Sequence, residues 1–178
     1  THYRNQKAEE IIRKGRQRQH MEIALGKQPL HYSFDPDYTL LYVDEEDGRV
    51  VFIRNAHKRK IKYLGKKITV FLPNLLFVKV SMSVSIYATS YPRSTQLYSA
   101  PLRNISQTGS LCLGDVEMPP TNKDINELMK EVSENVLSAK FTDHAAMNTA
   151  SGYKEPDVIE ALKKNEFKLS MMRKLNQK

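Results

Sequence analysis

The spacing of apolar residues divides this chain into a central block with one period and two flanks with another. From Tyr38 the pattern changes to short apolar stretches typical of strands, and from Val78 to Ile86 apolar residues alternate with polar ones, as in a strand that buries one face. An Asp-Gly pair between the first two of these stretches predicts a hairpin turn. We therefore expect a four-stranded antiparallel meander, with strands over residues 38–43, 49–53, 67–72 and 75–88.

The flanks carry apolar residues three to four positions apart, which predicts helices. These helices are expected over residues 3–25, over residues 124–137 and from Pro156 to Met172. Gly26 is a stop signal for the first helix, and Thr121 or Asn122 is the expected cap of the second. A block of strands between helices places the chain in the α+β class.

The length of 178 residues, 40% of them hydrophobic, suits one well-packed core with appended segments. We divide the chain into a basic helix over residues 1–30, a core domain over residues 31–145 and a C-terminal helix over residues 146–178. A single cysteine excludes an internal disulfide. No leader and no apolar run of membrane-spanning length is recognised, so we expect a cytoplasmic protein with a reduced thiol.

The formal net charge of +8 comes largely from two basic segments, residues 1–20 and residues 54–67. The second segment contains no acidic residue, and solvated surface is the ordinary interpretation of such a run. The functional interpretation is docking of an acidic partner, with Arg13, Arg16, Lys58, Arg59 and Lys60 as candidates. Nucleic acid is a less favoured partner, because few aromatic residues lie among the basic ones.

The single cysteine, Cys112, lies in a turn-rich stretch that can present a nucleophile. Asn104 precedes it by eight residues, and Gly109 between them allows the backbone to fold back. The side-chain amide of Asn104 can then stabilise an oxyanion beside the sulfur. The residue types alone favour a simpler interpretation, in which Cys112 is a small buried apolar residue and Asn104 holds its own turn.

A wider resemblance reverses that preference. The segment from Asn104 through Gly109, Leu111 and Cys112 to Leu113 resembles the active-site segment of ubiquitin-conjugating enzymes, in which an Asn stands at this distance before Gly-x-hydrophobic-Cys-Leu. Three further segments resemble the prokaryotic branch of that superfamily, the protein B type of PRTRC (ParB-related, ThiF-related cassette) systems or prokaryotic family D. They cover residues 72–77, 95–101 and 139–144.

The chain departs from the family pattern in three places. Leu102-Arg103 stands where eukaryotic conjugating enzymes have His-Pro, so other contacts must hold the loop. Asp143 is inserted into a Phe-Thr-His element, which changes the register of His144. The chain has no tryptophan, so the family's downstream Trp-Pro packing must be replaced, with Pro119-Pro120 as one candidate.

The resemblance implies a ubiquitin-conjugating-like fold and a carrier of a ubiquitin-like protein, held as a thioester on Cys112 and transferred to an amine. Asn104 would stabilise the oxyanion, with Gly109 and Leu111 shaping the loop. Asp115 is a candidate to orient the incoming lysine, equally readable as a turn residue, and His144 is a weaker candidate base.

The implied partners are a ubiquitin-like modifier, a ThiF-type activating enzyme and a deubiquitinase-like metalloprotease of the same operon. No cofactor or metal is expected. Two other functions stay open, a non-catalytic binding module of the same fold and a plasmid-maintenance protein that binds DNA through its basic segments.

Overall fold

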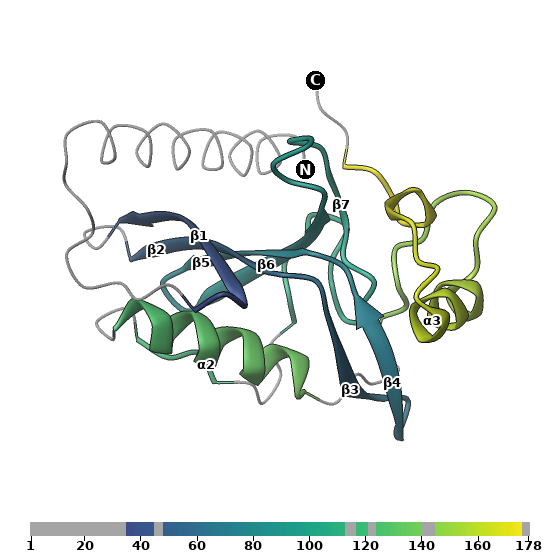
Figure 1. Cartoon of the computed structure of the whole chain (residues 1–178), viewed down its shortest axis with the longest axis horizontal. Coiled ribbons are helices and arrows are strands. Elements are labelled where there is room, and N and C mark those ends of the chain that lie inside the picture. Colours follow the sequence, from purple (N-terminus) through teal and green to yellow (C-terminus); the bar gives the residue numbers. More distant parts are fainter. Residues whose placement is uncertain (1–34, 45–47, 113–116, 121–123, 140–144, 176–178) are drawn as a thin grey trace.

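The computed structural model describes residues 35–44, 48–112, 117–120, 124–139 and 145–175. In this part of the chain, five strands form one antiparallel sheet in the order β1-β2-β5-β6-β7 (Figure 1). These strands are β1 (Tyr38–Asp44), β2 (Arg49–Arg54), β5 (Leu75–Val80), β6 (Ser83–Thr89) and β7 (Leu97–Ser99). The predicted hairpin over residues 38–53 is confirmed as β1 and β2. The predicted helix over residues 3–25 lies outside the described residues.

The single long strand predicted over residues 75–88 is wrong. The structure has two strands there, β5 and β6, joined at Ser81 and Met82, with Val80 paired to Ser83. Across this two-residue turn, odd-numbered residues of β5 pair with even-numbered residues of β6, so Phe77 and Ile86 are direct partners on the same face of the sheet. The alternation of apolar and polar residues therefore continues through the turn without a break, and the sequence pattern does not reveal the turn.

The four-stranded meander is also wrong, because the predicted strand over residues 67–72 belongs to a second sheet. It forms β4 (Lys66–Leu72), which pairs with β3 (His57–Tyr63) in a separate two-stranded hairpin between β2 and β5. The sequence pattern does not reveal β3, because most of its positions hold basic residues. Only Ile61 of this strand is fully buried. The α+β class itself agrees with the structure.

Helix α2 (Ile125–Leu137) covers one face of the main sheet (Figure 1). Its buried stripe includes Leu128, Met129, Val132 and Val136, as the sequence period predicts. On the sheet side, the ring of Phe52 stacks on that of Phe77 with centroids 5.0 Å apart. The cap is Asp124, whose side chain accepts hydrogen bonds from the N–H groups of residues 126 and 127, and not Thr121 or Asn122.

The segment after α2 completes the fold on the side of β7. Helix α3 (Glu155–Lys164) packs on β4 and is followed by the short 3-10 helix η1 (Leu169–Met171). The predicted continuation of the helix to Met172 is wrong, because Asn165 takes a left-handed conformation with φ of 58° and ends it. Beyond η1 the chain pairs with β7, and the Leu175 N–H donates to the Leu97 carbonyl at 3.0 Å.

Candidate active site

Residues 104–112 form a small hairpin, called here the cysteine hairpin, that brings Asn104 and Cys112 together. The Cys112 N–H donates to the Asn104 carbonyl at 3.0 Å, and Ile105 pairs with Leu111 in an antiparallel bridge. Inside it, the Ser106 N–H donates to the Ser110 carbonyl at 2.9 Å. The backbone therefore folds back between Asn104 and Cys112, as their eight-residue spacing predicts.

The cysteine hairpin is attached to the edge of β6, beyond the end of β7. The Ile86 N–H donates to the Gly109 carbonyl at 2.8 Å, and the Leu111 N–H donates to the Val84 carbonyl at 3.0 Å. These bonds make the second arm of the hairpin a further strand-like partner of the sheet. The side chain of Leu111 packs against the core on the side of α2. A rigid sheet thus positions the loop that carries the thiol.

Gly109 is required at the turn for two independent reasons. Its φ of +88° is a left-handed conformation that residues with a side chain rarely adopt. A Cβ atom at this position would also lie 2.3 Å from Cε1 of Tyr87. The Tyr87 hydroxyl in turn donates to the Thr108 carbonyl at 2.7 Å, which holds the ring under the turn. The predicted fold-back at Gly109 therefore depends on the absence of a side chain.

Asn104 is held at both its backbone and its side chain by Ala145. Its N–H donates to the Ala145 carbonyl at 3.1 Å, and its Oδ1 accepts from the Ala145 N–H at 3.2 Å. Because a backbone N–H can only donate, this contact identifies the oxygen end of the side-chain amide. The NH₂ end is therefore the donor that Asn104 has for any other acceptor. Its φ of 63° is left-handed, a conformation that asparagine tolerates better than most residues.

A largely buried ion pair next to Asn104 joins the cysteine hairpin to α3. Arg103 Nε donates to both carboxylate oxygens of Glu155, at 3.1 and 2.9 Å, and both side chains are only 13% exposed. The Met147 N–H donates to Glu155 at 2.8 Å, and the hydroxyl of Tyr63, at the end of β3, donates to it as well. The carboxylate of Glu155 thus connects four separate segments of the chain.

The protonation behaviour of this cluster follows from its burial and its hydrogen bonds. Burial and the acceptor Glu155 raise the pKa of Tyr63 to about 12. Burial also acts to raise the pKa of Glu155, but the bonds from Arg103, Tyr63 and the Met147 N–H outweigh it and hold that pKa below its usual value. At neutral pH the cluster is therefore a carboxylate paired with a guanidinium and a neutral phenol.

A second polar contact joins the start of the cysteine hairpin to the segment that begins at Ala145. Asn148 Nδ2 donates to the Ile105 carbonyl at 2.9 Å, one residue beyond the Asn104 contact with Ala145. Residues 103–106 and 145–148 are therefore held side by side by side chains from both. These contacts stand where the sequence lacks the His-Pro of eukaryotic conjugating enzymes, and Leu102 beside them is buried in the core.

The predicted site residues fall into three groups. Cys112 is exposed and is a free thiol, with Asn104, Gly109 and Leu111 in the same hairpin. Asp115, His144, Arg13 and Arg16 lie outside the described residues. Lys58 and Lys60 are exposed on β3, whereas Arg59 is bound to Glu134 of α2 through both guanidinium nitrogens, at 3.2 and 3.0 Å.

The sequence does not predict that Arg103 and Glu155 support the site. Their partnership leaves no local period, because the two residues are 52 positions apart. The sequence does indicate, through Leu102-Arg103 in place of His-Pro, that other contacts hold the loop, but it does not identify the residues that make them. No group of three His, Cys, Asp or Glu side chains that could hold a metal ion occurs in the described part of the chain.

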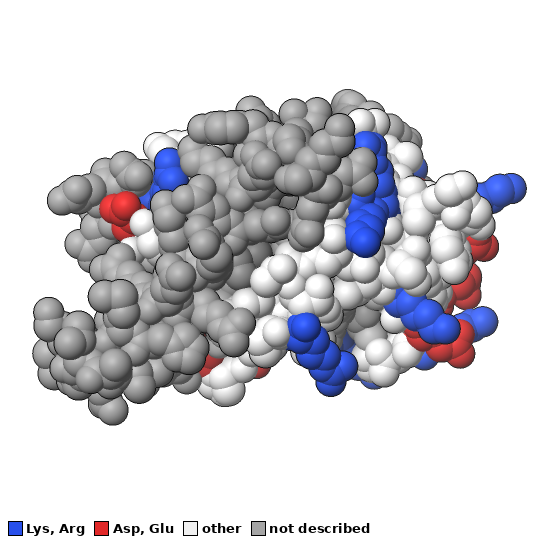
Figure 2. Space-filling model, turned by 90° about the horizontal axis from the view of Figure 1, so that it is seen from above, with Lys and Arg blue, Asp and Glu red and all other residues white. Residues whose placement is uncertain are grey.

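The charges on the surface are unevenly matched. On the face shown in Figure 2, basic groups over the middle of the molecule stand among uncharged residues, whereas towards the right-hand edge basic and acidic groups adjoin.

Among the described residues, no helix is long and apolar enough to span a membrane.

Comparison with known proteins agrees with the resemblance seen in the sequence. The sequence model described as Prokaryotic E2 family D matches residues 14–177, a range that includes the strands, the cysteine hairpin and both described helices. No curated protein and no solved structure matches the chain significantly. E2 is the usual name for ubiquitin-conjugating enzymes, and the match covers most of this sequence. The chain belongs to prokaryotic E2 family D.

Proposed function

We propose that this protein carries a ubiquitin-like protein as a thioester on Cys112 and transfers it to an amine. One observation carries the proposal. The only cysteine of the chain is exposed at the end of a sheet-anchored hairpin, with its N–H bonded to the residue that the family pattern places before it, Asn104. Family membership supports the reaction class. A ThiF-type activating enzyme and the modifier itself are the partners that this reaction requires.

Loading of Cys112 is a thiol exchange. The Cys112 thiolate attacks the carbonyl carbon of the modifier's thioester on the activating enzyme, a new C–S bond forms, and the activating enzyme's own thiolate leaves. One thioester replaces another, so the reaction is nearly neutral in energy and depends mainly on positioning. The attachment of the cysteine hairpin to β6 supports this requirement, because the sulfur is then held on a rigid sheet.

Discharge is the harder step. The amine nitrogen attacks the thioester carbonyl, negative charge collects on the oxygen, and collapse forms the amide while the Cys112 thiolate leaves. The proton lost by the amine passes to solvent or to a nearby base. The NH₂ end of Asn104 is the proposed donor to the oxyanion, since its oxygen end is bound to the Ala145 N–H. Asp115 remains a proposed carboxylate near the incoming amine.

The thioester is tested by incubating the protein with the modifier, the activating enzyme and ATP, and separating the products without reductant. An adduct that reductant removes, and that Cys112→Ala does not form, is the expected result. Because Cys112 is exposed, Cys112→Ala is also expected to change stability by less than about 1.5 kcal/mol, below the cost of emptying a packed core site. An adduct that persists in Cys112→Ala would rule the thioester out.

The role of Asn104 is tested by timing loading and discharge separately. If its amide stabilises the oxyanion, Asn104→Ala slows discharge to free lysine about a hundredfold and leaves loading nearly intact. Asn104→Asp is at least as slow, since a carboxylate repels the developing charge. The contacts with Ala145 also suit a purely structural role. In that case both steps fall together with the melting temperature, and Asn104 leaves the catalytic site.

A non-catalytic binding module of the same fold is the alternative function. The side-chain oxygen of Asn104 already serves a structural contact, which such a module would retain. It predicts no adduct on Cys112 under any condition, together with modifier binding that Cys112→Ala leaves unchanged.

A further inference from the structure

The β3–β4 hairpin has two chemically different faces. Residues that pair directly across an antiparallel ladder point to the same side, so the register assigns every side chain to a face. The inner face contains buried Ile61 and Val70 together with Arg59. The outer face consists of Lys58, Lys60 and Lys62 on β3 with Lys67, Thr69 and Phe71 on β4. All four charges of this outer lysine face are positive.

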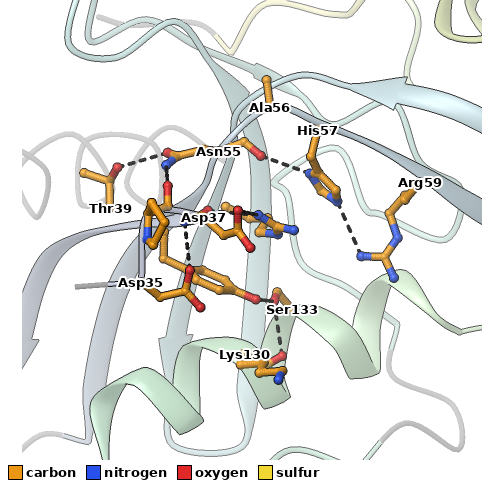
Figure 3. A network of polar contacts seen from close by, with 12 residues as sticks. Asp35, Asp37, Thr39, Asn55, Ala56, His57, Arg59, Lys130 and Ser133 are labelled. Atoms are coloured by element: carbon orange, nitrogen blue, oxygen red, sulfur yellow. Dashed lines mark hydrogen bonds and ion pairs between the residues drawn. The ribbon is translucent and has the colours of Figure 1, made fainter. Parts of the chain in front are cut away.

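The inner face holds the hairpin in place. Arg59 makes two hydrogen bonds to Glu134 of α2, and Ile61 and Val70 belong to the main core. The start of the β3–β4 hairpin is fixed by Asn55, whose side chain accepts from the Thr39 hydroxyl at 3.0 Å and donates to the Pro36 carbonyl at 2.8 Å (Figure 3). The outer lysine face is therefore presented in a fixed orientation.

A histidine continues this support from the base towards Arg59 (Figure 3). His57 Nδ1 contacts the Asn55 carbonyl at 2.9 Å, so this nitrogen carries the proton. Its Nε2 faces Arg59 at 3.5 Å and is the acceptor. Burial and the charge of Arg54 lower the pKa of His57, which agrees with a neutral ring between two fixed groups.

The lysines of the outer lysine face form no ion pair with any described residue. Within the described residues no carboxylate pairs with any of its four lysines, whereas Arg54, Arg59 and Arg103 each have one. Lys62 and Lys67 are directly opposite each other in the ladder, an arrangement that destabilises a hairpin. Lys58 lies over the ring of Phe71, 5.3 Å from its centroid. An acidic partner would neutralise this positive charge, which no carboxylate of the described residues pairs with.

The hairpin reaches the candidate active site at its far end. Tyr63 is the last residue of β3, and its hydroxyl donates to Glu155, the carboxylate that also binds Arg103. Arg103 directly precedes Asn104. A protein bound to the outer lysine face therefore contacts a hairpin whose far end is hydrogen-bonded to Glu155. This is the carboxylate that also holds Arg103 beside the cysteine hairpin.

We propose that the outer lysine face is an electrostatic docking surface for an acidic protein that approaches Cys112. This assignment rests on the function proposed above, and the acidic protein that we assign to this surface is the activating enzyme. An enzyme that hands over its acyl group must meet the carrier quickly and leave again, and exposed lysines accelerate encounter more than they strengthen binding. The arginine and aromatic anchors of tight interfaces are largely absent from this face.

Lysines also protect open strand edges from pairing with other chains, and among the described residues β3 and β4 pair with no further strand. The two roles respond differently to charge reversal. Glutamate protects an edge as well as lysine does, because either charge opposes pairing. Only docking depends on the sign of the charge.

The experiment compares two triple reversals with the same change in net charge. The first is Lys60→Glu, Lys62→Glu and Lys67→Glu on the outer lysine face. The control is Lys130→Glu, Lys164→Glu and Lys168→Glu, three exposed lysines on α2, at the end of α3 and before η1. We expect the first variant to load Cys112 at least tenfold more slowly at low salt, while the control loads at nearly the wild-type rate. Added salt should remove the difference by screening.

A single reversal separates docking from stability. Lys67→Glu places an acid opposite Lys62, so it should raise the melting temperature while it slows loading by a few-fold. Slower loading in a more stable protein cannot come from damage to the fold. Loading at the wild-type rate in both Lys67→Glu and the outer triple variant would overturn the proposal, as would equal slowing in the control. Loss of duplex DNA binding without any change in loading would reassign the surface to nucleic acid.

Binding to the activating enzyme, measured with each set of reversals in a Cys112→Ala background, requires no thioester chemistry. If the wild type forms no adduct but the outer reversals still weaken binding, the carrier function fails and the docking surface stands. If adducts form and binding ignores the outer reversals, the docking surface fails and the carrier function stands.

Discussion

The β3–β4 hairpin and the cysteine hairpin are built alike and stabilised differently. Each turns at a glycine with positive φ, Gly65 at +80° and Gly109 at +88°, and each is joined to a helix by an arginine–glutamate pair. The pair of the first, Arg59 with Glu134, leaves the carboxylate 41% exposed. The pair of the second, Arg103 with Glu155, is 13% exposed on both sides. We therefore expect the Arg59–Glu134 pair to contribute less to stability than the Arg103–Glu155 pair.

The largest expected effect is the loss of the less exposed pair, Arg103 with Glu155. Arg103→Met leaves the Glu155 carboxylate buried without its guanidinium, which costs about 4 kcal/mol of unfolding free energy. Arg59→Met leaves Glu134 in contact with water and should cost about 1 kcal/mol. Urea unfolding of both variants measures the difference. Equal losses would show that the two hairpins are held equally, against the burial of their pairs.

The next effect separates the two turns. Gly109→Ala combines left-handed strain with a methyl group 2.3 Å from the Tyr87 ring, and should cost about 3 kcal/mol. Gly65→Ala has similar strain but nothing within 4 Å of the added Cβ, and should cost about 1 kcal/mol. Thermal unfolding tests both. A Gly109→Ala protein as stable as Gly65→Ala would mean that Tyr87 moves aside without cost.

The smallest effect sharpens the comparison through pH. Tyr63→Phe removes a hydrogen bond to a charged group and should cost about 2 kcal/mol near pH 8. The pKa of Tyr63 is raised from 10.0 to about 12 in the folded protein, so this contribution is complete below pH 10 and disappears as pH rises through 12. The stability difference between wild type and Tyr63→Phe should therefore shrink over that window. A difference that stays constant with pH would place the Tyr63 proton elsewhere.

Sequence patterns predicted the parts of this fold whose signals are local. The apolar stretches that became β1 and β2 and the apolar stripe of α2 are each set by residues close together in the sequence, and the structure contains them. The β3 strand was missed because apolar alternation cannot detect a strand whose outer face is lysine. The turn at Ser81 was missed because a two-residue turn leaves alternation intact.

The candidate site divides in the same way. The spacing from Asn104 to Cys112 and the glycine between them predicted the fold-back, since all three lie in one hairpin. The partners of Asn104 and Arg103 are Ala145 and Glu155, from segments dozens of residues away. No period or spacing connects such segments until the chain has folded, so only the structure could supply them.

The pairing of β7 with residues 173–175 matters for synthesis on the ribosome. The chain emerges from its N-terminal end, and strands β1 to β6 are available long before the residues that border β7 or the glutamate that binds Arg103. Until those residues emerge, one sheet edge is open to stray pairing and the thiol loop has no clamp. A nascent chain therefore acquires its sheet first and its candidate reaction centre last, so that incomplete products lack an organised nucleophile.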